Sequence, residues 1–198
     1  MSASRAPRPH VAVAIIGSGF GGLGMAIRLK RDGVEDFVIL ERAADVGGTW
    51  RDNTYPGCAC DVQSQLYSFS FALEPRWTRY YSRQPDIWAY LRRVAREYAV
   101  LPHVRFHHDV RGAEWDGDRQ RWEIETSQGT ITAGALVMAT GPLSDPVIPS
   151  LPGLERFRGK AFHSARAGPL VRGAQRGGGA TGKAVTRSDP AAATPDPS

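Results

Sequence analysis

The sequence has 198 residues, of which 41% are hydrophobic, so the chain is long enough to bury the core of one domain. Its formal net charge of +5 comes mainly from residues 1–10 and 167–198, each of which contributes +2. Because the body between them has no basic face interleaved with aromatic side chains, we expect no nucleic-acid binding. The absence of an 18-residue apolar run and of a signal-peptide pattern predicts a cytoplasmic protein without membrane contact.

The first forty residues predict a strand–turn–helix–strand unit. Residues 11–16 form an apolar run typical of a buried parallel strand, and a glycine-rich turn at residues 17–22 follows it. Apolar side chains at helical spacing over residues 23–31, followed by Gly33, predict a helix. Residues 37–40 then predict a second apolar strand, so the lengths suit a βαβ unit of about 30 residues.

The middle of the chain combines an irregular segment, a helix and a run of short strands. Residues 44–83 have many aromatic side chains and no clear period, so we expect an ordered segment that lines a ligand. A proline in the first turn and apolar residues at helical spacing, Trp88 among them, predict a helix from Gln84 to about Tyr98. Alternating residues then predict an antiparallel meander inserted before a last parallel strand at residues 135–139. The meander strands are expected at residues 104–110, 113–115, 121–126 and 130–133.

The composition of the chain changes abruptly at Ala167. Of the 32 residues from there on, 17 are glycine, alanine or proline, and none is aromatic. Such a segment cannot bury enough apolar surface to offset the entropy lost on ordering. We therefore expect residues 167–198 to be a disordered tail and residues 1–10 to be flexible.

The turn between the first strand and the first helix, Gly17–Gly22, matches the dinucleotide-binding pattern G-x-G-x-x-G. Gly17 would make the tight turn, Gly19 would let the backbone approach a pyrophosphate, and Gly22 would let the helix pack closely on the strand. Glu41 ends the second strand 24 residues after Gly17, where its carboxylate can bind a ribose diol and repel a 2′-phosphate. The pattern predicts a Rossmann-like α/β domain that binds FAD or NAD; a turn that binds nothing is the alternative.

A second group of residues resembles the flavin-containing and Baeyer–Villiger monooxygenase superfamily. The segment DVGGTW at Asp45–Trp50 and the segment NTYPGCACD at Asn53–Asp61 are similar to the stretch that lines the flavin in that family. The resemblance continues to Ala139-Thr140-Gly141 and to a partial fingerprint, Phe157-x-Gly159-x-x-x-His163. It favours FAD over NAD and implies an incomplete FAD-binding domain over residues 11–166.

The resemblance also implies which residues hold the flavin. Gly47 to Trp50 would lie along the flavin, and Tyr67 and Asp61, the candidate catalytic group, would lie near the isoalloxazine ring. Backbone atoms around Val110 would hold the adenine. Core packing is the alternative explanation for the two aromatic residues, and a surface turn is the alternative for the aspartate. The expected cofactor-binding residues are Gly17, Ser18, Gly19, Phe20, Gly22, Glu41, Gly48, Thr49, Trp50, Asp61, Tyr67, Val110, Ala139, Thr140 and Gly141. No metal ligand is expected.

The activity implied by the resemblance is that of an NAD(P)H-dependent flavoprotein monooxygenase. In the family, NADPH reduces FAD, and the reduced flavin captures O₂ as a C4a-(hydro)peroxide that oxygenates a small ketone, amine or sulfide. The family's second G-x-G-x-x-G, which holds NADPH, has no counterpart after His163. We therefore expect this chain alone to be inactive, and the alternative function is that of a truncated or frame-shifted remnant that at most binds FAD.

The two cysteines distinguish this sequence from other flavoproteins. Cys58 and Cys60 are one residue apart, which is the wrong spacing for the C-x₄-C pair of a disulfide reductase and unfavourable for a disulfide between them. Without further cysteines they also make a poor zinc site, so we expect reduced thiols. An NAD-dependent dehydrogenase is disfavoured because the aromatic segment has no role in one.

Overall fold

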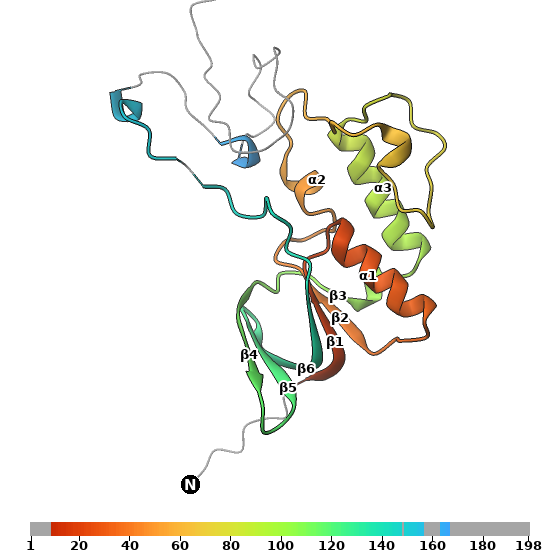
Figure 1. The fold of residues 1–198 in the computed structure, drawn as a ribbon, viewed down its shortest axis with the longest axis vertical. Helices are drawn as coiled ribbons and strands as arrows, with labels where there is room; N and C mark the ends of the chain where they lie inside the picture. Colours follow the sequence, from red (N-terminus) through yellow and green to blue (C-terminus); the bar gives the residue numbers. More distant parts are fainter. Residues whose placement is uncertain (1–8, 148, 157–162, 167–198) are drawn as a thin grey trace, which may run out of the picture. The chain divides into compact units, whose positions relative to one another are not determined.

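The computed structural model describes residues 9–147, 149–156 and 163–166 (Figure 1). The chain divides into two compact units, which are residues 1–49 with 88–142, and residues 50–87 with those from 143 on. The expected disordered tail lies outside the described residues, as do the first eight residues of the expected flexible N-terminus. Within the described part, no helix has both the length and the apolar character needed to cross a bilayer.

The first unit contains a six-stranded mixed sheet. Its strands are β1 (His10–Ile16), β2 (Phe37–Leu40), β3 (Val104–Arg105), β4 (Val110–Asp116), β5 (Arg121–Thr126) and β6 (Gly129–Met138). They lie in the order β3-β2-β1-β6-β5-β4, in which the first four strands are parallel to one another. β5 pairs antiparallel with both β6 and β4, so the other half of the sheet is a meander.

Two longer helices accompany these strands. In α1 (Phe20–Arg31), the side chains of Leu23, Ala26 and Ile27 are buried at helical spacing, and the helix contacts β1 and β2 (Figure 1). In α3 (Gln84–Glu97), a similar buried stripe includes Leu91 and Val94. The short helices are α2 (Thr49–Asp52), η1 (Ser64–Leu66), η2 (Leu101–His103), η3 (Leu154–Arg156) and η4 (Ser164–Arg166).

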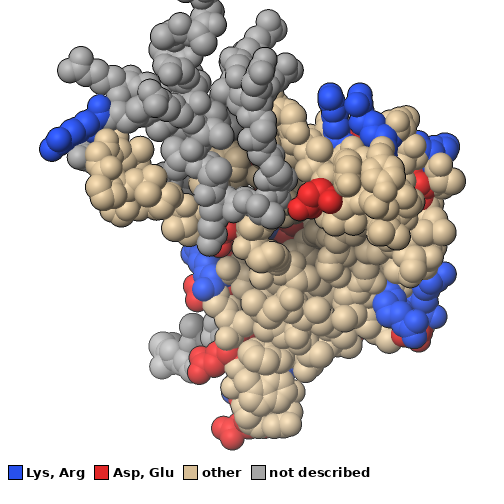
Figure 2. All heavy atoms as spheres, turned by 45° about the horizontal axis from the view of Figure 1, so that its top comes forward, with Lys and Arg blue, Asp and Glu red and all other residues tan. Residues whose placement is uncertain are grey.

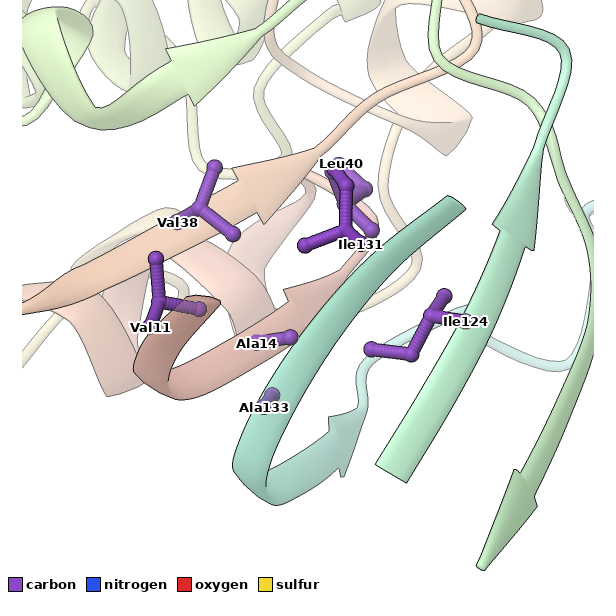
Figure 3. Close-up of a cluster of buried hydrophobic side chains, with 7 residues drawn as sticks. All are labelled: Val11, Ala14, Val38, Leu40, Ile124, Ile131 and Ala133. Atoms are coloured by element: carbon purple, nitrogen blue, oxygen red, sulfur yellow. The ribbon is translucent and has the colours of Figure 1, made fainter. Parts of the chain in front are cut away.

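A buried apolar cluster connects the parallel half of the sheet with the meander (Figure 3). Ile124, from the meander strand β5, is completely buried in this cluster. Removing such side chains from water is the main favourable contribution to folding. The cluster therefore stabilises both halves of the sheet together. Its members are Val11 and Ala14 of β1, Val38 and Leu40 of β2, Ile124 of β5, and Ile131 and Ala133 of β6.

The Rossmann-like α/β class predicted from the sequence is confirmed, and several strand boundaries were predicted wrongly. The strand expected at residues 113–115 is β4, which begins at Val110 and ends at Asp116. The strand expected at residues 104–110 ends at Arg105, because His107 has a left-handed backbone, with φ of 59°, that no strand accommodates. The strands expected at 130–133 and 135–139 are one strand, β6. Its first half pairs with β5 and its second half with β1, so the two halves have different apolar patterns.

The second unit has little regular secondary structure, but hydrogen bonds hold its loop. The Ser64 hydroxyl lies 2.7 Å from the Arg79 carbonyl oxygen and 2.6 Å from the Ser82 hydroxyl. The Cys60 backbone N–H donates to the Ser82 carbonyl oxygen, and the Gln84 N–H donates to the Cys58 carbonyl oxygen. These polar groups thus have hydrogen-bond partners within the irregular segment.

Charged side chains are intermixed on the face drawn in Figure 2. Among the residues coloured there, Lys and Arg form separate small groups and no continuous basic surface. In the described part of the chain, several arginines form short ion pairs with acidic neighbours, such as Arg93 with Glu97 at 2.6 Å and Arg28 with Asp32 at 2.8 Å. Because exposed pairs of this kind contribute little to stability, we assign them no role in the fold.

Candidate dinucleotide-binding site

The glycine turn lies where three parallel strands end. The Gly17 N–H donates to the Leu40 carbonyl oxygen at the end of β2, and the Ala139 N–H beyond β6 donates to the Ile16 carbonyl oxygen of β1, both at 2.9 Å. A Cβ atom added to Gly17 would lie only 2.7 Å from the Ala139 carbonyl oxygen. The turn is therefore packed against the carboxyl end of the sheet, where ligands bind in open α/β folds.

The N-terminus of α1 begins directly after this turn and is suited to an anion. Its N-cap residue is Gly19, no side chain caps the helix, and its first turn contains no acidic residue. The first N–H groups of a helix have no partner within the helix and form its positive end. A Cβ atom on Gly22 would overlap the Gly17 carbonyl oxygen, so glycine is needed for the helix to begin this close to β1. The helix starts three residues earlier than its apolar spacing predicts.

Glu41 places a buried carboxylate beside the turn, directly after β2. Glu41 is only 4% exposed. One carboxylate oxygen accepts hydrogen bonds from the Ser18 N–H at 3.0 Å and from the Ser18 hydroxyl at 2.5 Å, and the other accepts from the Ala43 N–H at 2.9 Å. The carboxylate is thus fixed in position by the backbone and side chain of the glycine turn.

The GGTW segment meets the same turn from a distant part of the sequence. The Gly47 N–H donates to the Ser18 carbonyl oxygen at 3.0 Å. A Cβ atom on Gly48 would lie 3.2 Å from the Gly19 Cα atom, so the two glycine backbones are in close contact. Thr49 then begins α2. The structure therefore brings together two of the motifs that the sequence predicts to bind a cofactor.

Of the other expected cofactor residues of the first unit, Phe20 and Ala139 lie at this turn, whereas Val110 begins β4 at the edge of the sheet. The ring of Phe20 stacks on Tyr90 of α3, with centroids 6.1 Å apart, so its side chain is engaged by the protein. The His108 N–H donates to the Glu41 carbonyl oxygen at 2.9 Å, which places the chain leading to Val110 beside Glu41. Thr140 and Gly141 are exposed beyond the end of β6.

Trp50, expected along the flavin, and Tyr67 and Asp61, expected near its ring, all belong to the second unit. The Trp50 indole N–H donates to the Tyr67 hydroxyl at 2.9 Å, and the two rings meet edge to face. The Gln84 side-chain amide donates to the Trp50 carbonyl oxygen. Burial raises the pKa of Tyr67, and the charges of Cys60 and Asp61 raise it further against the opposing Trp50 hydrogen bond. Tyr67 is therefore protonated at neutral pH, and Asp61 itself is exposed.

Cys58 and Cys60 are both buried and not joined in a disulfide. Burial raises the pKa of each thiol above its ordinary value. The neighbouring Tyr55 has its pKa raised to about 12, chiefly by burial and also by its hydrogen bond with Cys58. Protonated buried thiols are poor nucleophiles. No group of His, Cys, Asp or Glu able to hold a metal ion occurs among the residues that the structure describes.

Two residues of α3 contact the DVGGTW segment, and their role could not be identified from the sequence. The Trp88 indole N–H donates to the Val46 carbonyl oxygen at 2.9 Å. The Arg92 guanidinium lies over the Trp88 ring, 5.0 Å from its centroid, and its Nε is 3.1 Å from an Asp45 carboxylate oxygen. In the sequence, Trp88 does not differ from the other apolar residues of the predicted helix. The available signal for its role is that Arg92 follows four residues later, on the same face of the helix.

Comparison with known proteins agrees with the motifs. A family model described as pyridine nucleotide-disulphide oxidoreductase matches residues 14–170. A Baeyer-Villiger monooxygenase of Streptomyces coelicolor is 62% identical over 157 residues, which cover 79% of this chain and 30% of that protein. The solved structure of cyclohexanone monooxygenase from Rhodococcus sp. Phi1 bound to NADP+ is 35% identical with a TM-score of 0.74, covering 84% of this chain and 32% of that one.

A further solved structure contains both nucleotides. The OTEMO complex with FAD and NADP is 33% identical with a TM-score of 0.72, and the match covers 81% of this chain and 31% of that one. This chain thus spans about 30% of the length of the relatives it matches. The resemblance to Baeyer–Villiger monooxygenases expected from the motifs is confirmed.

Proposed function

The chain belongs to the pyridine nucleotide-disulphide oxidoreductase family, and we propose that it forms the FAD-binding part of an NADPH-dependent Baeyer–Villiger-type monooxygenase. The observation that carries this proposal is the contact between Gly19 and Gly48, since it joins the dinucleotide-binding turn to the GGTW segment. The GGTW segment resembles the stretch that lines the flavin in Baeyer–Villiger monooxygenases, so its contact with the turn favours FAD over NAD.

The residues of the first unit suit the ADP half of FAD. The uncapped N-terminus of α1, at Gly19, offers N–H donors and a positive helix end to the pyrophosphate. The fixed carboxylate of Glu41 accepts hydrogen bonds from ribose hydroxyls and repels a 2′-phosphate. Backbone atoms next to Val110 hold the adenine. Ala139, Thr140 and Gly141, at the end of β6, border the same site.

The residues of the second unit are proposed to receive the flavin ring. FAD, when bound, supplies the redox and oxygen-activating chemistry of the reaction. Trp50 and Tyr67 offer a largely apolar surface whose hydroxyl stays protonated at neutral pH. Asp61 is the candidate catalytic residue, because a carboxylate beside the ring would alter the electrostatic potential there. Together these residues bind the ring, orient it and exclude water.

Buried thiols argue against disulfide chemistry in spite of the family's name. A redox-active cysteine needs an exposed thiol with a lowered pKa. Here burial raises the pKa values of Cys58 and Cys60. Oxygenation is therefore the better proposal, with O₂ and a small organic molecule as substrates. A ketone is favoured over an amine or sulfide because one relative of known structure is a cyclohexanone monooxygenase.

The proposal is tested by titrating the purified chain with FAD and recording absorbance and fluorescence spectra. We expect the spectrum of bound flavin, and about tenfold weaker binding for Glu41→Gln, since a charged acceptor is replaced by a neutral one. Glu35→Gln is the matched control, because the Glu35 side chain is 60% exposed and should leave FAD binding unchanged. A folded chain that leaves the FAD spectrum unaltered refutes the proposal.

The second candidate function is FAD binding without turnover. The chain spans about 30% of the length of the relatives it matches, so turnover is tested separately from binding. Adding NADPH to the FAD-loaded chain without oxygen separates the two candidates. Loss of the oxidised flavin band supports the monooxygenase function, and an unchanged band supports binding alone.

A further inference from the structure

We propose that Trp88 and Arg92 are positioning residues that hold the Asp45–Gly48 segment on the glycine turn and so preset the site for its ligand. That the ligand is FAD rests on the function proposed above. We call Trp88, Arg92 and the segment that they hold the clamp, and its contacts are present in the protein without ligand. It consists of three side-chain contacts and the contact of Gly47 and Gly48 with the glycine turn, all within the first unit.

The first contact is the hydrogen bond from the Trp88 indole N–H to the Val46 carbonyl oxygen, at 2.9 Å. Val46 is completely buried. A buried carbonyl oxygen that loses its donor keeps the full cost of its lost hydration. This hydrogen bond therefore fixes the backbone between Val46 and Gly47.

Arg92 supplies the second and third contacts from one turn further along α3. Its guanidinium lies over the Trp88 ring, 5.0 Å from the centroid, and its Nε is 3.1 Å from an Asp45 carboxylate oxygen. Stacking on an indole and pairing with a carboxylate are both favourable for a guanidinium. Arg92 thus restrains the indole and the start of the segment at the same time.

The fourth contact passes this restraint to the glycine turn. The Gly47 N–H donates to the Ser18 carbonyl oxygen, and the backbone of Gly48 rests against that of Gly19. A segment that is already ordered does not lose conformational entropy when a ligand binds. The clamp is therefore expected to strengthen binding through preorganisation, without a contact between α3 and the ligand.

The Arg92 side chain is not what packs α3 into the protein. Tyr90, Leu91 and Val94 on the same helix are buried, whereas the Arg92 side chain is 46% exposed. Replacing Arg92 should therefore leave the helix in place and release the segment. A merely structural residue would instead weaken the whole unit.

The experiment uses the full chain with the variants Trp88→Phe, Arg92→Met and Arg92→Lys, and the control Arg96→Met. Arg96 is an exposed arginine one turn beyond Arg92 on the same helix. Amide hydrogen exchange of residues 43–49 is measured without FAD, and FAD binding is then titrated. We expect about tenfold faster exchange and about tenfold weaker FAD binding, or ~1.4 kcal/mol, for Trp88→Phe and Arg92→Met.

Rescue separates positioning from a general loss of stability. Arg92→Lys keeps a positive charge near Asp45 but loses the planar guanidinium over Trp88, so both measurements should fall between those of the parent and Arg92→Met. Arg96→Met should match the parent. Exchange that rises throughout the first unit, instead of at residues 43–49, would overturn the clamp as a local device.

The remaining outcomes distinguish this inference from the proposed function. Unchanged exchange in Trp88→Phe and Arg92→Met overturns the clamp, whatever the chain binds. Faster exchange with parental FAD affinity overturns the positioning role and leaves the FAD site intact. A parent chain that binds no FAD, but whose variants exchange faster at residues 43–49, supports the clamp and refutes the proposed function.

Discussion

Replacing Gly17 by alanine tests how tightly the glycine turn is packed on the sheet. Gly17 has a φ of +96°, and an added Cβ atom would lie 2.7 Å from the Ala139 carbonyl oxygen and 3.2 Å from its carbonyl carbon. These are backbone atoms, held by the hydrogen bond from the Ala139 N–H to the Ile16 carbonyl oxygen. They cannot rotate away as a flexible side chain would, so either the turn or the end of β6 must move.

The expected loss of stability has two parts. An alanine at positive φ costs about 1–2 kcal/mol. A contact of 2.7 Å is well inside the range of favourable contacts, and relieving such an overlap typically costs about 1–3 kcal/mol. The sum of about 2–5 kcal/mol corresponds to a fall in melting temperature of about 4–20 °C for a chain of this size.

Two other glycines separate these parts. Gly33 has a φ of +80°, but a Cβ atom there would meet nothing within 4 Å, so Gly33→Ala should cost only the conformational ~1–2 kcal/mol. Gly21 lies within α1, where its Cβ atom would be at an ordinary 3.6 Å from that of Ala139. Gly21→Ala should be neutral or stabilise by up to ~1 kcal/mol through helix propensity.

Urea unfolding followed by circular dichroism, combined with FAD titration, measures this series. The expected order of stability is Gly21→Ala, at or above the parent, then Gly33→Ala, then Gly17→Ala. FAD affinity should fall for Gly17→Ala alone, because Gly33 lies at the other end of α1. Equal losses for Gly17→Ala and Gly33→Ala would refute the argument, since the close approach to β6 would then contribute nothing.

Ser18→Ala removes the 2.5 Å hydrogen bond to the Glu41 carboxylate, so the free energy of unfolding in urea should fall by about 1.5–3 kcal/mol. A change below ~0.5 kcal/mol would show that this hydrogen bond does not fix the carboxylate. The pKa of Tyr55 is raised from 10.0 to about 12, so the unfolded chain loses this proton first, and stability should decrease as the pH rises from 10 to 12. Urea unfolding over that range should show a flatter decline for Tyr55→Phe, and an identical decline would contradict the assignment. Because burial raises the pKa values of Cys58 and Cys60, both thiols should react slowly with a thiol reagent at neutral pH until urea unfolds the chain; rapid labelling of the folded protein would disprove their burial.

The strands β1 and β2 were predictable because buried parallel strands have sequences that are short runs of apolar residues. The start of α1 was not, since Gly21 and Gly22 have poor helix propensity, and only the close packing of Gly22 on Gly17 requires a glycine there. The early end of β3 was not predictable, because the alternation of apolar and polar residues continues past Arg105. A single residue with positive φ, His107, ends the strand, and no pattern in the sequence reveals it.

Residues of the candidate site were predictable where a motif carries its own geometry. Gly17, Gly19 and Glu41 follow from a strand, a turn and a spacing. Trp88 and Arg92 do not, because their role depends on contacts with a segment 42 residues away. A tertiary contact of this kind leaves no periodic trace in the sequence.

The position of β1 between β2 and β6 has a consequence for how the chain is made. β1 pairs with β6 through residues such as His10 and Thr132, which are 122 positions apart. At ~5–20 residues per second, the ribosome needs roughly 6–25 s to synthesise that interval. Throughout it, one edge of an apolar central strand has no partner and can pair with other nascent chains. The yield of native protein should therefore depend on the speed of translation up to Met138.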